Sequence, residues 1–494
     1  MAGMTGSSPS PADPRGLRGD APLLDAYLRF LETGSRPFTI PGHKQRGDLV
    51  GTVVAGDVPL YGGLDTMRLS AGVLGQAERR AARLWGADVC RFSVGGSTHG
   101  NQALALAVAQ PGAPVVVSRS LHRSLLLGLV LAGLEPVWVS PAVDPATGLP
   151  TAVPVSEVEA AIRAHPEVRA VFLGDPSYVG TISDIAGHAR AAHAHGIPLI
   201  VDAAWGAHFG FHPALPAHAL ALGADAIVTS AHKALPAYSQ AAMVLATTDR
   251  LDPDRLERGF EATHTTSPAG AILASIDAAR SLLERDGAEL IGRLLHRVAD
   301  ARRRLRAIEG VEVLDGTGVD PAKLVVLLAG TGASGFDIEA DLMARQMPLE
   351  MTGRDTIIPM LTIADDDEVL DELTEALTSS VARRRGPPRS PVVAAVWSVE
   401  PETVMAPREA FFAGHVPVPA DEAVGRVSAE LVAPYPPGVP VLAPGERVTR
   451  AALDSLVRAR DEGARIAYAA DPSLATLQVV AGRPRRVGDP MAAC

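Results

Sequence analysis

Short apolar runs rich in β-branched residues alternate with longer stretches of Ala, Leu and His between about Ala87 and Thr247. The short runs suit strands that are covered on both faces, and the longer stretches are long enough for helices. This alternation predicts strand–helix units around a mostly parallel, doubly wound sheet. The expected strands are Cys90–Val94, Val115–Ser118, Pro136–Val139, Ala170–Leu173, Pro198–Val201, Ala226–Thr229 and Ala242–Ala246, with helices such as Asn101–Ala109 and Asp184–His195 between them.

The pattern changes after His264. Two long stretches of helical period follow, separated by the breaker Asp286-Gly287, and then two strands, a further helix and a linker rich in Arg and Pro. The expected elements are helices Ala269–Arg285, Leu290–Ile308 and Glu368–Arg383 and strands Val311–Leu314 and Leu324–Leu328. We therefore expect a mobile N-terminal tail with a helix (1–35), a major domain (36–267), a second, smaller α/β domain (268–386) and a C-terminal domain (387–494).

With 47% hydrophobic and 20% charged residues, the composition is that of a globular chain. Its 494 residues are too many for a single hydrophobic core, so several compact domains are expected. A net charge of −11 argues against a nucleic-acid partner. The two cysteines, Cys90 and Cys494, cannot form a disulfide framework or a metal site, and this indicates a reducing cytoplasm, with Cys90 in the core. The first twenty residues lack the pattern of a signal peptide, and Leu125–Leu134, the closest approach to a membrane span, is too short.

Three predicted strand ends carry candidate chemistry, and in open α/β sheets such ends face a ligand crevice. At the first, a strand runs into Gly95-Gly96-Ser97-Thr98 and then a helix. Backbone N–H groups and two hydroxyls there could cradle a phosphate. The same letters also describe an ordinary turn followed by a helix cap.

The second strand ends in Asp202, followed by Trp205. A carboxylate at the end of a buried strand requires a partner, and the protonated ring nitrogen of pyridoxal phosphate would provide one. The alternative is that Asp202 only caps the following turn.

The third strand ends in Ser230-Ala231-His232-Lys233, about thirty residues further on. Partial burial would lower the pKa of the Lys233 amine and make it an imine-forming nucleophile. Ser230 and His232 could bind phosphate oxygens, although an isolated His-Lys pair is more often an exposed surface feature. Cradle, carboxylate and lysine together supply what a pyridoxal-phosphate site needs.

A further candidate is His122, which follows another predicted strand. Its imidazole could stack on the cofactor ring, and the alternative is a histidine that merely begins a helix.

On these residues the chain resembles the ornithine/lysine/arginine decarboxylase family, pyridoxal-phosphate enzymes of aspartate-aminotransferase fold (fold type I). The matching stretches are Pro41-Gly42-His43-Lys44, Gly96-Ser97-Thr98, the segments around His122 and Asp202, Asp175-Pro176-Ser177-Tyr178-Val179-Gly180, Ser230-Ala231-His232-Lys233 and Thr265-Thr266-Ser267-Pro268. Near the C-terminus they are Pro407-Arg408-Glu409-Ala410-Phe411, Gly425-Arg426-Val427-Ser428-Ala429-Glu430 and Pro434–Pro440. The resemblance covers most of the chain and is to the short members that lack an N-terminal receiver-like domain.

The resemblance implies a large domain with a mostly parallel seven-stranded sheet that binds pyridoxal phosphate, a smaller α/β domain and a C-terminal α+β domain. It implies a covalent Schiff base between the cofactor and Lys233, pairing of Asp202 with the pyridinium and stacking of His122 on the ring. The remaining implied cofactor contacts are Gly96, Ser97, Thr98, Ser230 and His232 at the phosphate, Trp205 beside Asp202, and Thr265 and Thr266 reaching the neighbouring subunit's cofactor. Glu430 could meet the substrate's distal cation.

The implied reaction is decarboxylation of arginine, lysine or ornithine to the corresponding amine and carbon dioxide. The resemblance implies a homodimer or higher even oligomer with sites at the subunit interface. We expect a cytoplasmic enzyme of polyamine biosynthesis that uses no metal and binds no nucleic acid or membrane. Which basic amino acid is preferred stays open, because that choice depends on a pocket assembled from two subunits.

Several positions depart from the family pattern. Gly95 stands where Asn is usual, and Ser120 and Arg123 replace Asn and Lys around His122. The stretch Leu64–Gly72 is shortened, and Glu400–Val404 lacks the usual Arg and aromatic residues. Two rival functions therefore remain: another pyridoxal-phosphate reaction such as transamination or oxidation, with Arg345 or Arg354 as the carboxylate clamp, and a non-catalytic relative.

Overall fold

The computed structural model describes residues 11–34, 38–58, 64, 72–391, 397, 399–435 and 438–482. These residues form two compact units. Unit 1 comprises the chain up to Ala107, Ile200–Arg293 and Thr362–Ala364, and unit 2 comprises Val108–Leu199, Leu294–Leu361 and the chain from Asp365 onward. Cys494 and most of the shortened stretch Leu64–Gly72 lie outside the described residues.

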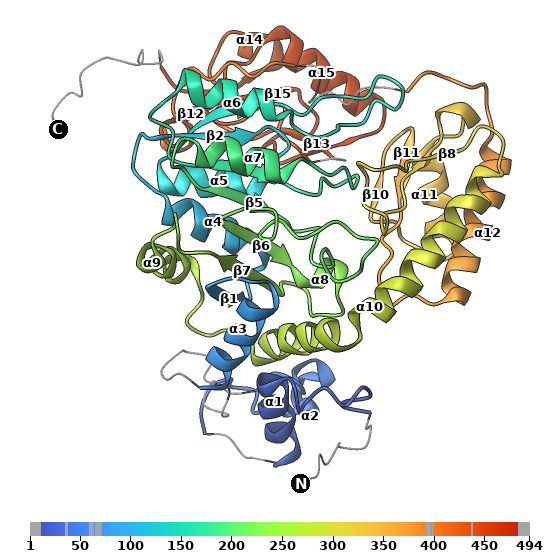
Figure 1. Ribbon diagram of the computed structural model, residues 1–494. Coiled ribbons are helices and arrows are strands. Elements are labelled where there is room, and N and C mark those ends of the chain that lie inside the picture. Colours follow the sequence, from blue (N-terminus) through green and yellow to red (C-terminus); the bar gives the residue numbers. More distant parts are fainter. Residues whose placement is uncertain are drawn as a thin grey trace. The chain divides into compact units, whose positions relative to one another are not determined.

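A seven-stranded sheet has the order β1-β7-β6-β5-β4-β2-β3 (Figure 1). Strand β7 runs antiparallel to β1 and β6, whereas β5 pairs with β6, and β2 with β3 and β4, in parallel. The strands are β1 (Val89–Ser93), β2 (Pro114–Ser118), β3 (Glu135–Val139), β4 (Val171–Gly174), β5 (Leu199–Asp202), β6 (Ala226–Ser230) and β7 (Ala242–Ala246). The sequence prediction of a mostly parallel seven-stranded sheet is confirmed, because buried apolar runs mark each strand.

The helices that follow and precede these strands match the predicted alternation (Figure 1). Unit 1 contains α1 (Pro22–Glu32), α2 (Gly47–Val50), the 3-10 helix η1 (Thr52–Val54), α3 (Val73–Leu84), α4 (Gly96–Ala107), α8 (Ala231–Ala234) and α9 (Pro253–Thr263). Unit 2 contains α5 (Arg123–Ala132), α6 (Val155–Ala164) and α7 (Ile185–His193). Helix α4 begins at Gly96, earlier than the expected start at Asn101, so the Gly-Ser-Thr cradle is the first turn of a helix.

The expected break at Asp286-Gly287 is wrong, because one helix, α10, runs from Gly270 to Arg306. A glycine inside a helix costs only about 1 kcal/mol relative to alanine, so it does not by itself end one. Here the missing side chain allows close packing, since a Cβ at Gly287 would lie 3.0 Å from Leu283 Cδ1 and 3.8 Å from Phe211 Cβ.

Within unit 2 a four-stranded antiparallel sheet has the order β10-β11-β9-β8 and is accompanied by α11 and α12, which pack on each other. Its strands are β8 (Glu312–Val313), β9 (Val326–Leu327), β10 (Met351–Thr352) and β11 (Thr356–Ile358). The helices are α11 (Gly335–Met343) and α12 (Asp367–Arg384), and the 3-10 helix η2 spans Ala329–Thr331. The strands are shorter than the sequence pattern predicts, whereas the last helix is confirmed.

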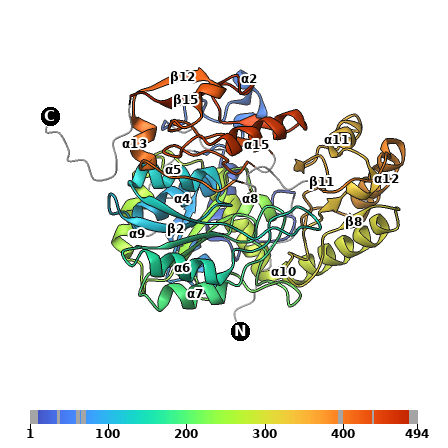
Figure 2. The same cartoon turned by 90° about the horizontal axis from the view of Figure 1, so that it is seen from above.

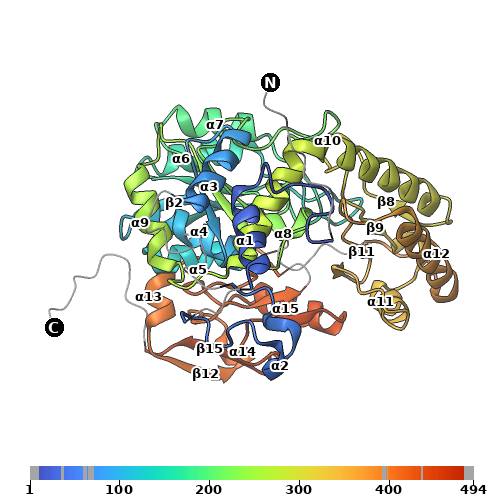
Figure 3. The ribbon, with the colours of Figure 1, turned by 90° about the horizontal axis from the view of Figure 1, so that it is seen from below.

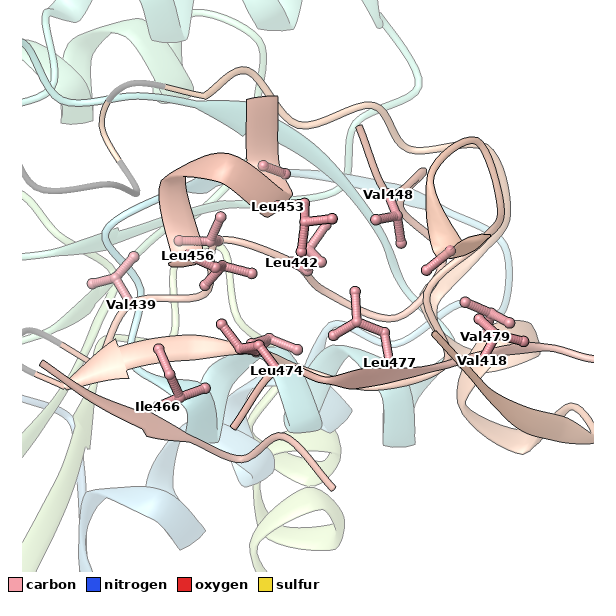
Figure 4. Close-up of a cluster of buried hydrophobic side chains, with 14 residues drawn as sticks. Val418, Val439, Leu442, Val448, Leu453, Leu456, Ile466, Leu474, Leu477 and Val479 are labelled. Atoms are coloured by element: carbon pink, nitrogen blue, oxygen red, sulfur yellow. The ribbon is translucent and has the colours of Figure 1, made fainter. Parts of the chain in front are cut away.

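The C-terminal segment, residues 399–482, also belongs to unit 2. It pairs β12 (His415–Pro419) with β15 (Thr476–Val480) and β13 (Ala433–Tyr435) with β14 (Arg465–Ala467), and Figure 2 shows β12 and β15 side by side. Its helices are α13 (Pro407–Phe412), α14 (Ala420–Ala423) and α15 (Arg450–Asp461). A core of its own, including Leu442, Leu453 and Leu477, packs between these elements (Figure 4).

Outside these elements, residues 11–20 form turns in which the buried carboxylate of Asp13 accepts the N–H groups of Leu17 and Arg18. Cys90 is buried, as expected. In the part of the chain that is described, no helix is long and apolar enough to cross a membrane. Nor do three or more His, Cys, Asp or Glu side chains gather there as metal ligands would.

Candidate active site

The first turn of α4 lies against the end of β6 in unit 1. Gly96 has φ +67°, a left-handed value that favours glycine, and its N–H donates to Gln240 O at 2.9 Å. The first bond of α4 runs from His99 N–H to Gly95 O, so the amides of Ser97 and Thr98 have no acceptor within the helix. The hydroxyls of Ser97 and Ser230 lie 2.6 Å apart. Two residues expected at the phosphate are therefore neighbours.

Close packing of α4 on the sheet produces this approach. A Cβ at Gly100 would collide with the side chain of Val228 in β6 and lie 3.0 Å from Val244 Cγ2 in β7. Only glycine allows α4 to lie this near the two strands, so Gly100 sets the place of the helix N-terminus.

Asp202 ends β5, opposite Val228 of β6. One carboxylate oxygen accepts Ala204 N–H at 3.1 Å, and the other accepts Nδ2–H of Asn101 at 2.7 Å. The turn cap considered for Asp202 is thus present, and a second donor is added to it. Asn101 was missed as a site residue, because a polar residue inside a helix gives no periodic signal, and it is only 2% exposed.

Lys233 lies in α8, directly after β6, and its Nζ is 4.0 Å from the centroid of the Trp205 ring. His232 places Nδ1 2.9 Å from Ala241 O. Because a carbonyl only accepts hydrogen bonds, Nδ1 carries the proton, and Nε2 is left for another partner. A lysine, an aromatic face and an imidazole therefore meet at one strand end.

The Gly95 departure from the family pattern coincides with a buried histidine in the same unit. A Cβ at Gly95 would lie 2.9 Å from His99 Cβ, tighter than real Cβ contacts. His99 bonds Ser93 Oγ through Nδ1 and Phe260 O through Nε2, each at 2.8 Å. It therefore links the strand before the cradle to α9, after which the exposed Thr265 and Thr266 follow.

His122 belongs to unit 2, where it is the N-cap of α5 and accepts Ser124 N–H at Nδ1. The interpretation of His122 as a residue that begins a helix is thus correct, and the residue is also exposed. Glu430, also in unit 2, accepts Ala470 N–H and Gln478 N–H, one at each carboxylate oxygen and both at 2.7 Å. These bonds hold it to the backbone of the C-terminal segment.

Two groups of the Asp175–Gly180 stretch have altered pKa values. Burial raises the pKa of Asp175 to about 7, against the lowering effect of hydrogen bonds from Ser183, and Asp320 raises it further. Burial also raises the pKa of Tyr178. Both side chains therefore stay protonated over a wider pH range than usual.

Transamination would require an arginine that binds the substrate carboxylate, and one of the two candidates, Arg354, is already paired with carboxylates of this chain. Arg354 pairs with Asp355 at 2.6 Å and with Glu462 at 3.6 Å, and its guanidinium is thereby neutralised. Arg345 donates to Ser379 Oγ at 3.1 Å.

These geometries suit a phosphorylated aromatic aldehyde. The chain has three lysines, Lys44, Lys233 and Lys323, and only Lys233 lies at the carboxyl end of a strand of the large sheet. Hydroxyls and backbone amides at the start of a helix can bind the phosphate. A carboxylate that accepts two hydrogen bonds, as that of Asp202 does, can pair with a protonated ring nitrogen. Fold and site together define a pyridoxal-phosphate enzyme of aspartate-aminotransferase type.

Comparison with known proteins identifies the branch of that class. The profile of the Orn/Lys/Arg decarboxylase major domain matches residues 21–352, and that of the family's C-terminal domain matches residues 391–465. The chain belongs to the Orn/Lys/Arg decarboxylase family. It is a decarboxylase, and pyridoxal phosphate is its cofactor.

Individual relatives span almost the whole chain. It is 30% identical to the arginine decarboxylase of Halalkalibacterium halodurans, over 93% of this chain and 97% of that protein. It is also 30% identical to the arginine decarboxylase of Bacillus subtilis, over 93% and 98%. The constitutive lysine decarboxylase of E. coli has a similar fold, with a TM-score of 0.77 at 20% identity, covering 93% of this chain and 82% of that one.

Proposed function

We propose that this chain decarboxylates L-arginine to agmatine, with Lys233 as the cofactor-bearing residue. The observation that carries the proposed site is the convergence, within unit 1, of the Ser97–Ser230 contact, the Asn101–Asp202 hydrogen bond and Lys233 beside Trp205. Arginine is favoured because two relatives at 30% identity are arginine decarboxylases, whereas the similarity to a lysine decarboxylase of Pseudomonas aeruginosa is 25%.

The phosphate of the cofactor is bound at the first turn of α4. Gly96 gives the chain its left-handed entry, and Ser97 and Thr98 present amides and hydroxyls. Ser230 completes the group from the end of β6. His232 contributes Nε2, because its Nδ1 proton is committed to Ala241 O.

The ring nitrogen is bound by Asp202. Its two oxygens accept hydrogen bonds from Asn101 Nδ2–H and Ala204 N–H, and these bonds fix the orientation of the carboxylate that would pair with the ring nitrogen. When bound, the cofactor would supply an electron sink for loss of carbon dioxide, with Asp202 holding its ring nitrogen. Trp205 flanks Lys233 on the side of its Nζ and limits where the amine points.

The other roles draw on the family resemblance. His122 stacks on the ring, with Nδ1 fixed by its helix-cap bond. Thr265 and Thr266 reach the cofactor of a second subunit in a homodimer, or higher even oligomer, with shared sites. Glu430 stays the candidate for the distal cation of the substrate, although its backbone bonds at both oxygens leave only the remaining lone pairs for that purpose.

The same reasoning gives the wider context. We infer the domain boundaries 1–35, 36–267, 268–386 and 387–494 and a cytoplasmic location. We also infer a place in polyamine biosynthesis, because decarboxylation of arginine yields a guanidino amine that is a precursor of polyamines. Family membership does not favour transamination, oxidation or loss of catalysis.

Carbon dioxide release, with identification of the amine, tests the proposal. The purified chain with pyridoxal phosphate is given arginine, lysine or ornithine separately, with Lys233→Ala as the control. Agmatine from arginine at the highest kcat/KM supports the proposal. Cadaverine or putrescine as the main product would overturn the substrate, and a keto acid in place of carbon dioxide would overturn the reaction.

A further inference from the structure

The loop between β2 and α5, residues 119–122, carries His122 and is held from several sides by the C-terminal segment. All these contacts lie within unit 2. One backbone bond, from Arg119 N–H to Val139 O at 2.7 Å, ties the start of the loop to β3, and bonds within the loop are short-range, such as Ser118 Oγ to Ser120 Oγ at 2.7 Å. Side chains that pack on the loop add to this backbone bond.

Arg119 makes the first connection. Its guanidinium and the carboxylate of Glu446 form a two-pronged ion pair in which Nη2–Oε2 is 2.9 Å, and the two side chains are 3% and 2% exposed. Nη2 also donates to Val441 O at 3.1 Å, and Glu446 accepts Ala443 N–H at 2.8 Å. A buried pair is tolerated when its polar atoms are satisfied in this way, and it is specific in geometry.

Two further arginines connect α5 to the same segment. Arg123, directly after His122, lies over the ring of Tyr468 at 4.3 Å. Arg408 of α13 donates to Val130 O at 2.9 Å and Leu131 O at 2.8 Å. These carbonyls lie at the C-terminus of α5, where the helix dipole favours a positive charge. Figures 2 and 3 show α13 beside α5. The C-terminal segment thus contacts both ends of the helix that His122 caps.

We propose that the C-terminal segment is a positioning device for the His122 ring, acting through Glu446 on Arg119 and Tyr468 on Arg123. The inference rests on the proposed stacking of His122 on the cofactor. Arg119 at the start of the loop and Arg123 directly after His122 are held by the C-terminal segment, and His122 between them is exposed. Arg123, a departure from the family pattern, thereby gains a role through its partner Tyr468.

A double-mutant cycle on cofactor affinity tests the proposal. The variants are Tyr468→Asn, which suits the left-handed backbone at φ +68°, and the paired change Arg119→Met with Glu446→Leu, which removes both buried charges together. Each is made alone and combined with His122→Ala. The readouts are the dissociation constant of pyridoxal phosphate and the visible circular dichroism of the bound cofactor.

His122→Ala is expected to weaken cofactor binding about 2- to 13-fold, the range for loss of an aromatic contact. Tyr468→Asn is expected to weaken it about 2- to 5-fold. Both clamp variants should alter the dichroic band, and neither should weaken binding further in the His122→Ala background. Glu402→Gln, which breaks the exposed Glu402–Arg447 pair of the same segment, is the matched control and should change nothing.

The outcomes separate the two claims. Full additivity with His122→Ala, or unchanged affinity and dichroism in the clamp variants, would overturn the positioning role while His122 kept its own effect. A His122→Ala variant with normal affinity and dichroism would overturn the stacking role itself, and the positioning proposal with it.

Discussion

At the scale of single residues, two hydrogen bonds fix the carboxylate of Asp202, and one of them comes from a side chain buried in α4. Asn101 is almost fully buried in α4, and its amide lies 2.7 Å from Asp202 Oδ2. A buried amide group is costly unless it is bonded, so the pair is mutually stabilising. The carboxylate can point in only one direction as a result.

Replacing Asn101 with Leu, a residue of similar size, is therefore expected to lower kcat roughly 10- to 100-fold, the range for losing a hydrogen bond to a charged group. The measurement is steady-state kinetics on arginine with the cofactor saturating. Gln102→Leu, one position further along α4, is the control. Equal losses in the two variants would contradict the special role of Asn101.

A second residue-scale prediction concerns Asp175, whose pKa burial raises to about 7. Its folded pKa lies above the unfolded value, so its contribution to stability is full below about pH 4 and is lost as the pH rises through about 7. The loss is on the order of 4 kcal/mol. Asp175→Asn keeps an acceptor for Ser183 N–H and removes the ionisation.

The Asn variant should therefore come close to the parent chain in thermal unfolding at pH 4 and exceed it at pH 8. Asp184→Asn at the N-cap of α7 is the control, since Asn also caps helices. A difference between Asp175→Asn and the parent that is the same at both pH values would show that Asp175 is not protonated in the native state.

The sequence pointed to candidate site residues where strand position and residue type coincide. Asp202 and Lys233 stand out because a charged side chain at the end of a buried apolar strand needs a partner. Asn101 and His99 do not, because their roles depend on which strand or helix packs beside them. The scarcity of lysine, with only Lys44 and Lys323 besides Lys233, was an available signal that would have strengthened the assignment.

At the scale of elements, the seven strands of the large sheet lie where apolar runs place them, whereas two helix boundaries do not. Helix α4 starts at the left-handed Gly96, and α10 continues through Gly287, which has little space for a side chain beside Leu283. Glycine begins a helix at Gly96 but lies inside one at Gly287. Single-sequence patterns cannot distinguish a breaker from a close contact, because that depends on tertiary neighbours.

The tight packing of α4 yields an element-scale prediction. Gly100→Ala forces the helix away from Val228 and Val244, and it is expected to lower stability by about 1–3 kcal/mol and weaken binding of pyridoxal phosphate. Thermal unfolding and cofactor titration measure the two effects. Adding Val228→Ala makes room for the new methyl group and should restore part of both; no recovery would mean that packing on β6 is not the cause.

At the scale of the whole molecule, the residues proposed for phosphate, ring and amine all belong to unit 1, although they come from separate parts of the sequence. Strand ends β1, β5 and β6 bring them together through sheet order, which the sequence does not encode locally. Domain boundaries along the chain therefore differ from the compact units in space. The family resemblance predicts which residues form the site, and the order of the strands explains why these residues lie close together.

Cofactor loading should accordingly protect unit 1 first. We expect slower amide hydrogen exchange in residues 95–101, 200–205 and 229–234 after addition of pyridoxal phosphate, because the proposed ligand contacts stabilise those turns. Helix α15, in the core of the C-terminal segment, serves as the internal reference. Protection that spares these three stretches would place the cofactor elsewhere.

The most direct test of the central claim is to locate the covalent attachment of the cofactor. The loaded enzyme is reduced with borohydride, digested and mapped by mass spectrometry, and with three lysines in the chain the answer has few alternatives. The account predicts the phosphopyridoxyl label on Lys233 and its loss in Lys233→Ala. Label on Lys44 or Lys323, or retention of the label in Lys233→Ala, would contradict it.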